Sequence, residues 1–206
     1  MTTNEAGPPT APVARQPIRR TDGGVLGHEY LYRSPTGEVA GVDRWPSHRQ
    51  DSASASVLRM LYGTRPPAGS GLVFVNVTRA FLVGRLPLPP ADRRLVLEVV
   101  ESVPADGASL AGLARLRAQG YRIALDDWTA TRDQRAMLPH ADFVKIDCRD
   151  LDAIGDAGLR RARAGGARLV AERVEDEDLR ARCVALRFDL LQGYALGRPS
   201  LVTGAA

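Results

Sequence analysis

The sequence predicts an α/β protein, a TIM-like (β/α)8 barrel in which one strand of an opening hairpin runs antiparallel to the other strands. Apolar strand-like runs alternate with helical segments through most of the chain, a pattern typical of a parallel sheet. A glycine-containing turn joins the first two runs, and the total of eight runs suits closure into a barrel. An open doubly wound sheet is the alternative, but no glycine-rich loop follows the first strand to favour it.

The first quarter of the chain is expected to hold a tail, a hairpin and a helix. Residues 1–12 are poor in large apolar side chains, so we expect a disordered N-terminal tail. The turn Asp22-Gly23-Gly24 lies between two strand-like runs and predicts the hairpin. The segment 51–62 has helical periodicity, with Asp51 or Ser52 as the expected N-cap.

The rest of the chain repeats a strand and then a helix or loop. Six apolar runs predict the remaining strands, at 72–78, 95–102, 123–128, 143–148, 168–174 and 190–197. Helices are expected between them at 108–120, 156–166 and 176–186. We therefore expect one domain, residues 13–200, followed by a short C-terminal tail, residues 201–206.

Composition excludes several classes of protein. The chain has 206 residues, 44% of them hydrophobic and 25% charged, as in ordinary globular domains. No apolar run reaches about 18 residues and no secretory signal is present, so we expect a cytoplasmic protein without a membrane partner. Cys148 and Cys183 follow no metal-ligand spacing and are expected to be reduced thiols. The net charge is +4, but the arginines are scattered, which argues against a nucleic-acid polymer and suits a small phosphate-bearing ligand.

Polar side chains recur at the ends of the predicted strands. In a barrel the carboxyl ends of parallel strands converge on one mouth, the usual place of an active site. A single acid at a strand end is usually a solvated loop residue or a helix cap, but its recurrence on seven strands favours a site. The residues concerned are Glu29, Asn76, Glu98, Glu101, Asp126, Asp127, Lys145, Asp147, Glu172, Glu175 and Gln192.

So many converging carboxylates need a counter-charge that one lysine cannot supply. Hard divalent cations prefer oxygen ligands, so we expect two Mg²⁺ or Mn²⁺ ions here, roughly 3.5 to 4 Å apart. Asp126 and Asp127 would point to opposite faces of a regular strand, but both can reach the mouth if the chain turns there. Such a site suits hydrolysis of a phosphate ester. An enolase-type enzyme, which also combines a basic residue with strand-end acids, is an alternative.

The ordered motifs RQPI, EYLYR, VNVT, LEVVES, LDDW, VKID, AERVE and QGYALGRP resemble those of the EAL domain, over about residues 14–199. The resemblance implies a phosphodiesterase that uses two Mg²⁺ or Mn²⁺ ions to cleave cyclic di-GMP to linear pGpG. The metal ligands that it implies are Glu29, Asn76, Glu98, Asp126, Asp127 and Glu172. The other implied residues are the catalytic Lys145, Glu172 and Gln192, the substrate contacts Gln16 and Arg33, and the loop supports Glu101, Asp147 and Glu175.

Three positions depart from the family pattern. Tyr30 stands where the signature has Ala, and Arg173 stands where the family has Gly. The family continues D-D-F-G-T-G, whereas the segment that follows Asp127 here contains no glycine and is slightly shorter. We expect this loss of glycine to remove positive-φ conformations and to weaken placement of the second metal. The residues of these motifs are most similar to those of EAL domains that are joined to an HDOD domain.

Three functions therefore stay open: a working phosphodiesterase, a receptor that binds cyclic di-GMP without hydrolysis, and a protein-interaction module. The complete set of ligand types favours the enzyme, whereas the altered loop favours the receptor. The retained acids argue against a purely structural module. Besides cyclic di-GMP, we expect a homodimer or a regulatory protein as partner.

Overall fold

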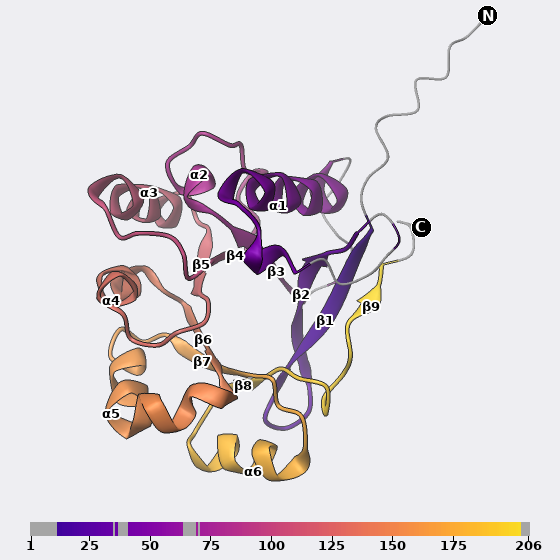
Figure 1. Cartoon of the computed structure of the whole chain (residues 1–206), viewed down its shortest axis with the longest axis vertical. Helices are drawn as coiled ribbons and strands as arrows, with labels where there is room; N and C mark the ends of the chain where they lie inside the picture. Colours follow the sequence, from indigo (N-terminus) through magenta and orange to yellow (C-terminus); the bar gives the residue numbers. More distant parts are fainter. Residues whose placement is uncertain (1–11, 35, 37–40, 64–68, 70, 203–206) are drawn as a thin grey trace, which may run out of the picture.

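The computed structural model describes residues 12–34, 36, 41–63, 69 and 71–202. Within these residues, nine strands form one sheet in the order β2-β3-β4-β5-β6-β7-β8-β1-β9, and β2 also pairs with β1. This last pairing closes the first eight strands of that order into a barrel (Figure 1). The predicted barrel is confirmed and the open sheet is excluded. Residues 1–11 and 203–206, which belong to the expected tails, lie outside the described residues.

The opening hairpin supplies the reversed strand. Strand β1 (Val13–Arg20) pairs antiparallel with β2 (Val25–Tyr32) on one side and with β8 (Leu190–Leu191) on the other. In the turn, the Asp22 carboxylate accepts a hydrogen bond of 2.8 Å from the Gly24 amide, and Gly23 has a φ of 91°. An Asx turn at Asp22 and a positive φ at Gly23 are what the Asp-Gly-Gly sequence favours. The hairpin prediction is therefore confirmed.

Five parallel strands and six α-helices complete the described barrel, with the helices lying along its outside (Figure 1). The strands are β3 (Leu72–Val77), β4 (Leu95–Val99), β5 (Arg122–Leu125), β6 (Phe143–Asp147) and β7 (Arg168–Glu172). The α-helices are α1 (Ser47–Tyr62), α2 (Arg79–Leu82), α3 (Gly107–Ala118), α4 (Arg132–Met137), α5 (Leu151–Arg163) and α6 (Glu177–Ala185). Short 3-10 turns lie at η1 (Val42–Arg44), η2 (Leu138–His140) and η3 (Cys148–Asp150).

Two predicted helix starts are wrong. Helix α1 begins at Ser47, directly after Pro46, so Asp51 lies inside the helix and does not cap it. The Asp51 carboxylate instead accepts a hydrogen bond from the Thr78 hydroxyl at the end of β3. Helix α5 begins at Leu151 and is interrupted at Gly155, whose φ of 57° is not helical. The sequence pattern identified only the part of each helix with regular apolar spacing.

The end of the chain also differs from the prediction. Strand β8 contains only two residues, because the chain bends at Gly193 and turns directly after it. A Cβ atom on Gly193 would lie 2.2 Å from the backbone N and O of Val174, so only glycine allows this close approach. The unexpected strand β9 (Ser200–Leu201) then pairs antiparallel with β1 outside the closed barrel, through Ala14 and Arg15.

The core has two layers. The larger layer packs the helices against the outer faces of the strands and includes Val75, Leu97, Ile123 and Leu169. The smaller layer fills the barrel interior with apolar side chains from β1 and from β3 to β8. Its buried members are Ile18, Leu72, Phe74, Val96, Ala124, Phe143, Val170 and Leu190.

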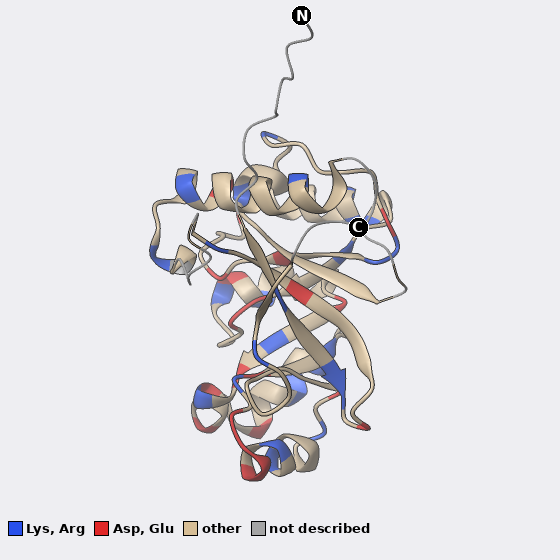
Figure 2. Cartoon of the chain, turned by 90° about the vertical axis from the view of Figure 1, so that its right-hand side faces the viewer, with Lys and Arg blue, Asp and Glu red and all other residues tan. Residues whose placement is uncertain are grey.

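Charged side chains are distributed over the whole fold. In the view of Figure 2, lysine and arginine segments occur on helices, strands and loops, without a single basic block. Among the described residues, no helix has both the length and the apolar content needed to cross a membrane.

Candidate active site

A layer of polar side chains lies directly above the apolar layer inside the barrel. On six parallel-running strands, each polar residue follows an interior apolar residue by two positions, so both side chains point inward. On the reversed strand β1 the order is inverted, and Gln16 precedes Ile18. The six pairs are Phe74 and Asn76, Val96 and Glu98, Ala124 and Asp126, Phe143 and Lys145, Val170 and Glu172, and Leu190 and Gln192.

Lys145 is the centre of this polar layer. Its side chain is 1% exposed, and Nζ lies 2.8 Å from Oε1 of Glu172, 3.3 Å from Oε2 of Glu29 and 3.4 Å from Oδ1 of Asp126. Nζ also forms an ion pair with Glu98. Burial alone would lower the pKa of Lys145, but the surrounding carboxylates outweigh burial and raise this pKa well above its usual value. Lys145 is therefore a permanent cation among four acids.

Glu98 lies deepest in the layer. It is fully buried, and it does not line the cavity described below. Burial, followed by the nearby charge of Glu29, raises the pKa of Glu98 well above its usual value, although Lys145 opposes this shift. Glu98 therefore holds a proton more strongly than an exposed glutamate, and its contact with Lys145 is the interaction that opposes this shift.

A chain of amides connects Glu29 to the reversed strand. Gln192 Nε2 donates to Glu29 Oε2 at 2.6 Å and lies 3.3 Å from Gln16 Oε1. Gln16 Nε2 in turn donates to the carbonyl oxygen of Gly197 at 3.1 Å. All three side chains are buried. This network fixes the carboxylate of Glu29 at the mouth of the barrel.

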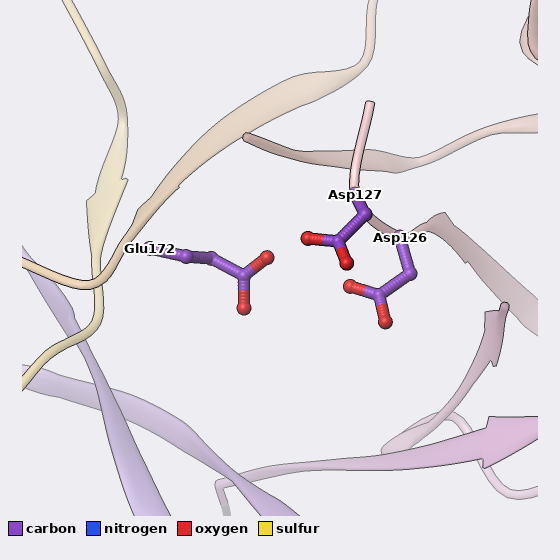
Figure 3. A group of neighbouring side chains, drawn as sticks. All are labelled: Asp126, Asp127 and Glu172. Atoms are coloured by element: carbon purple, nitrogen blue, oxygen red, sulfur yellow. The ribbon is translucent and has the colours of Figure 1, made fainter. Parts of the chain in front are cut away.

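Asp126, Asp127 and Glu172 form the most compact carboxylate group of the described residues. One oxygen from each lies within 4.8 Å of the other two. Figure 3 shows Asp126 and Asp127 on one side of the site and Glu172 facing them from the other. Asp127 has a φ of 41°, and this turn lets two consecutive side chains reach the mouth, as the sequence predicted. This group could hold a divalent cation.

Burial shifts the proton affinity of this carboxylate group. It raises the pKa of Asp127 to about 6, with a further contribution from the neighbouring Asp126 charge. It also raises the pKa of Glu172 to about 8, against the opposing effect of Lys145. Perturbed carboxyl groups of this kind are typical of sites that bind cations or move protons.

The loop after β5 is held by Gln134, which the sequence interpretation missed. Gln134 Nε2 donates to the carbonyl oxygens of Asp126 and Asp127 at 3.2 and 2.8 Å. Its Oε1 accepts from the amides of Thr129 and Thr131 at 3.0 and 3.2 Å. Thr131 caps α4 by accepting from the Gln134 amide, which completes a capping box. The Thr-x-x-Gln spacing was the signal that could have identified this residue.

The expectation that loss of glycine removes positive-φ conformations from this loop is wrong, whereas its expected effect on placement of the second metal stays a prediction. Asp127 and Ala130 adopt φ angles of 41° and 58° without being glycine. Such conformations cost about 1–2 kcal/mol for a residue that carries a Cβ, and the side chain of Gln134 stabilises the turn in which they occur. The loop therefore keeps a positive-φ geometry although its glycines are missing.

Asp147 lies at the rim of the site between two arginines. Arg149 Nη2 lies 2.5 Å from Oδ2 of Asp147, and Arg173 Nε lies 2.8 Å from the same oxygen. Burial would raise the pKa of Asp147, but the hydrogen bonds and charge of Arg149, together with Arg173, lower it overall. Lys145 and Asp147 face the same side of β6, as their spacing predicted.

The polar layer forms the floor of a cavity of about 380 Å³ at the carboxyl ends of the parallel strands. Most of the predicted site residues line this cavity, whereas Glu98 and Glu101 do not. Glu101 is exposed after β4, and its charge contributes to the raised pKa of Asp127. The predicted residues that line the cavity are Gln16, Glu29, Arg33, Asn76, Asp126, Asp127, Lys145, Asp147, Glu172, Glu175 and Gln192.

The side chains present fit divalent metal ions. In the part of the chain that the structure describes, Asn76 Oδ1 and Glu98 Oε2 are buried without a hydrogen-bond partner. An unpartnered buried oxygen is costly unless a donor or cation satisfies it. Together with the Asp126, Asp127 and Glu172 group, the site offers an all-oxygen ligand set, which Mg²⁺ and Mn²⁺ prefer.

Comparison with known proteins identifies similar chains. Cyclic di-GMP phosphodiesterase CdgJ of Vibrio cholerae is 30% identical over 197 residues, which cover 94% of this chain and 45% of CdgJ. Cyclic di-GMP phosphodiesterase RocR of Pseudomonas aeruginosa is 30% identical over 145 residues, 64% of this chain and 36% of RocR. The chain thus spans less than half the length of these two curated relatives.

A solved structure shows the same fold. BlrP1 of Klebsiella pneumoniae, in a complex with manganese and cyclic di-GMP, has a TM-score of 0.70 and 26% identity. The match covers 97% of this chain and 58% of that chain.

The resemblance to EAL domains linked to HDOD domains stays a prediction. The family model described as the EAL domain matches residues 80–199, more than half of the sequence, and the chain therefore belongs to the EAL domain family.

Proposed function

We propose that the chain hydrolyses cyclic di-GMP to linear pGpG with divalent metal ions. The observation that carries this proposal is the group of Asp126, Asp127 and Glu172 beside Lys145, on the floor of an open cavity. The names of CdgJ and RocR and the ligands of the BlrP1 complex support the choice of substrate. A metal-dependent hydrolase site is the chemistry that this arrangement fits best.

Each proposed metal ligand has a place in this scheme. Asp126, Asp127 and Glu172 would hold one ion, because their oxygens lie within 4.8 Å of one another. Glu29, Asn76 and Glu98 would hold the second ion, and in the described structure Asn76 Oδ1 and Glu98 Oε2 are buried without a hydrogen-bond partner. When bound, such ions lower the pKa of a water molecule and stabilise negative charge on phosphate oxygens.

The remaining catalytic roles follow from position and proton affinity. Glu172, with a pKa raised to about 8, binds a proton more strongly than an exposed glutamate and would accept one from the attacking water. Lys145 fixes Oε1 of Glu172 and balances the negative charge of the floor. Gln192, held between Glu29 and Gln16, would orient the water with its amide.

The substrate would contact the wall above the floor. Arg33 is buried directly after β2 and donates to the carbonyl oxygen of Tyr32 at 3.1 Å, which fixes its guanidinium beside the cavity. A fixed guanidinium is well suited to a phosphate group. Gln16, on the neighbouring strand, would contact the guanine base.

The first experiment tests hydrolysis directly. The purified chain is incubated with cyclic di-GMP and Mn²⁺ or Mg²⁺, and pGpG is measured by anion-exchange chromatography, with Glu172→Gln as the control. We expect pGpG from the wild type and none from the control. Calorimetric binding without pGpG would favour the receptor, and the absence of both binding and pGpG would overturn the proposal.

A further inference from the structure

Arg173 follows Glu172 and has an unusual backbone conformation. Its φ is 54°, in the left-handed region that a side chain with a Cβ disfavours. Strained residues of this kind concentrate at functional sites, where the surrounding structure maintains them. Asp127 shows the same behaviour in the same site, since its positive φ brings an additional side chain to the mouth. The parallel suggests that Arg173 also serves the site.

The contacts of Arg173 leave most of its guanidinium available. Nε is paired with Oδ2 of Asp147 at 2.8 Å, which fixes the direction of the side chain. Within the described residues, no hydrogen bond is formed by its two Nη groups. The side chain is 58% exposed and lines the cavity. It is therefore anchored at one nitrogen, with the other two free to bind a ligand.

Few cationic side chains line the described part of the cavity. Six carboxylates line it, whereas the cationic side chains among its described lining residues are Arg33, Lys145 and Arg173. Lys145 is surrounded by four carboxylates and cannot approach a second anion. Among the described lining residues, Arg33 and Arg173 are thus the cationic side chains that remain for phosphate groups, in addition to any bound metal ions.

The two arginines follow strands that lie on either side of β8 and β1 in the closed sheet. Arg33 follows β2 and Arg173 follows β7, and in the closed sheet these strands are separated by β8 and β1. The side chains that β8 and β1 present to the cavity, Gln192 and Gln16, are neutral amides. A ligand with two phosphodiester groups can lie across this neutral wall, with one group beside each guanidinium.

We propose that Arg173 is a substrate-binding residue that contacts one phosphodiester group of the ligand, while Arg33 contacts the other. The proposal rests on the proposed function, because it assumes that cyclic di-GMP enters this cavity. It assigns to Arg173 direct contact with the ligand, in addition to its ion pair with Asp147.

Arg149 provides a matched control. Arg149 and Arg173 contact the same carboxylate, and Arg149 does so with both Nε and Nη2. Arg149 does not line the cavity, and its side chain is 71% exposed. If Arg173 acts only by holding Asp147, replacement of either arginine should have the same effect. If Arg173 contacts the ligand, only its own replacement should weaken binding.

The experiment measures binding of cyclic di-GMP by calorimetry in Ca²⁺, at two salt concentrations, for the wild type, Arg173→Ala, Arg173→Gly and Arg149→Ala. We expect both Arg173 variants to raise Kd about ten-fold and to reduce its salt dependence. Arg149→Ala should leave Kd within about two-fold. Arg173→Gly should also raise the melting temperature, since it relieves the positive φ, and this separates the effect of the side chain from that of the backbone.

The possible outcomes are distinct. A wild type that binds, with Arg173→Ala binding equally well, would overturn the inference and leave the proposed function intact. An equal loss of affinity in Arg149→Ala would also overturn it, because Asp147 would then be the cause. A wild type that shows no heat of binding would overturn the proposed function, and the inference with it.

Discussion

Lys145 Nζ lies 2.8 Å from Oε1 of Glu172, on the neighbouring strand of the barrel, and both side chains are largely buried. Three further carboxylates surround the same ammonium group. This one cation therefore limits the mutual repulsion of the acids that form the floor of the site.

Replacement of Lys145 should strongly destabilise the protein. In Lys145→Met the four carboxylates lose their counter-charge, and breaking a buried ion pair in this way costs about 3–5 kcal/mol. Urea unfolding in chelator measures the loss. The double variant Lys145→Met with Glu98→Gln should recover part of it, since a buried acid that has lost its cationic partner is replaced by a neutral amide. A single variant as stable as the wild type would show that the cluster is not held by this charge.

The pH dependence of stability should differ with and without metal. Glu172 keeps its proton in the folded state up to about pH 8, whereas an unfolded glutamate loses it near pH 4.5. The folded state therefore holds the extra proton, and stability falls as pH rises through this window. His28 and His140, whose pKa values are lowered by burial, act in the opposite direction, but only below about pH 6.5.

The test is a series of melting curves in chelator from pH 6.5 to pH 8. We expect stability to fall by about 2 kcal/mol across this range, which corresponds to a melting temperature lower by roughly 4–8 °C. Glu172→Gln should remove most of this slope. In Mn²⁺ the slope should reverse, because metal ions bind the deprotonated carboxylates. A flat curve in chelator would contradict the raised pKa of Glu172.

Much of the site could be predicted from the sequence because its polar residues are two positions from apolar residues on the same strands. In a strand, residues two positions apart share a face, so Asn76 follows Phe74 inward and Lys145 follows Phe143. The barrel then brings these positions to one level, as strand pairing of Asn76 with Glu98 shows. The order of motifs along the chain was enough to establish this layer.

The features that the sequence did not reveal depend on local backbone geometry. The φ angles of Asp127, Ala130 and Arg173 are positive although none of them is glycine, and propensity predicts the opposite. Gln134 is separated from the acids it supports by a turn, so no periodic pattern connects them. Strand β9 has only two residues, which is too short for a recognisable alternation.

Hydrolysis should depend on divalent metal ions and on each proposed metal ligand, of which Asn76 is tested by substitution. Chelation should abolish hydrolysis, Mn²⁺ or Mg²⁺ should restore it, and Ca²⁺ should restore it poorly because it is larger and less strict in geometry. Asn76→Ala should reduce turnover at least 100-fold, yet change the free energy of unfolding by less than about 1 kcal/mol, since Asn76 Oδ1 has no hydrogen-bond partner within the described structure. Full activity of this variant, or activity in excess chelator, would refute the proposed metal site.

The strained loop offers a stabilising substitution. Ala130 has a φ of 58°, so Ala130→Gly should stabilise the fold by about 0.5–1 kcal/mol. Thr131→Ala, one residue later, should destabilise it by about 1 kcal/mol because the cap of α4 is lost. Urea unfolding of the two variants measures the contrast. Destabilisation by Ala130→Gly would show that this backbone conformation is not strained.

Gln134 should be the residue on which the geometry of Asp126 and Asp127 depends most. Its side chain is 4% exposed and satisfies two carbonyl oxygens and two amides of the loop. Gln134→Ala leaves these groups without partners, so we expect a loss of about 2–4 kcal/mol in the free energy of unfolding. The Asp126 and Asp127 carboxylates would then be less well placed, and the affinity for Mn²⁺, measured by calorimetry, should fall about ten-fold or more.

The conservative variant Gln134→Glu separates the two halves of this network. A glutamate keeps an acceptor for the amides of Thr129 and Thr131, but it loses the donor to the carbonyl oxygens of Asp126 and Asp127. Carboxylate and carbonyl oxygens repel each other, so this variant should lose as much Mn²⁺ affinity as Gln134→Ala although it keeps the acceptor for the two threonine amides. If Gln134→Glu binds Mn²⁺ as tightly as the wild type, the carbonyl contacts do not position the two aspartates.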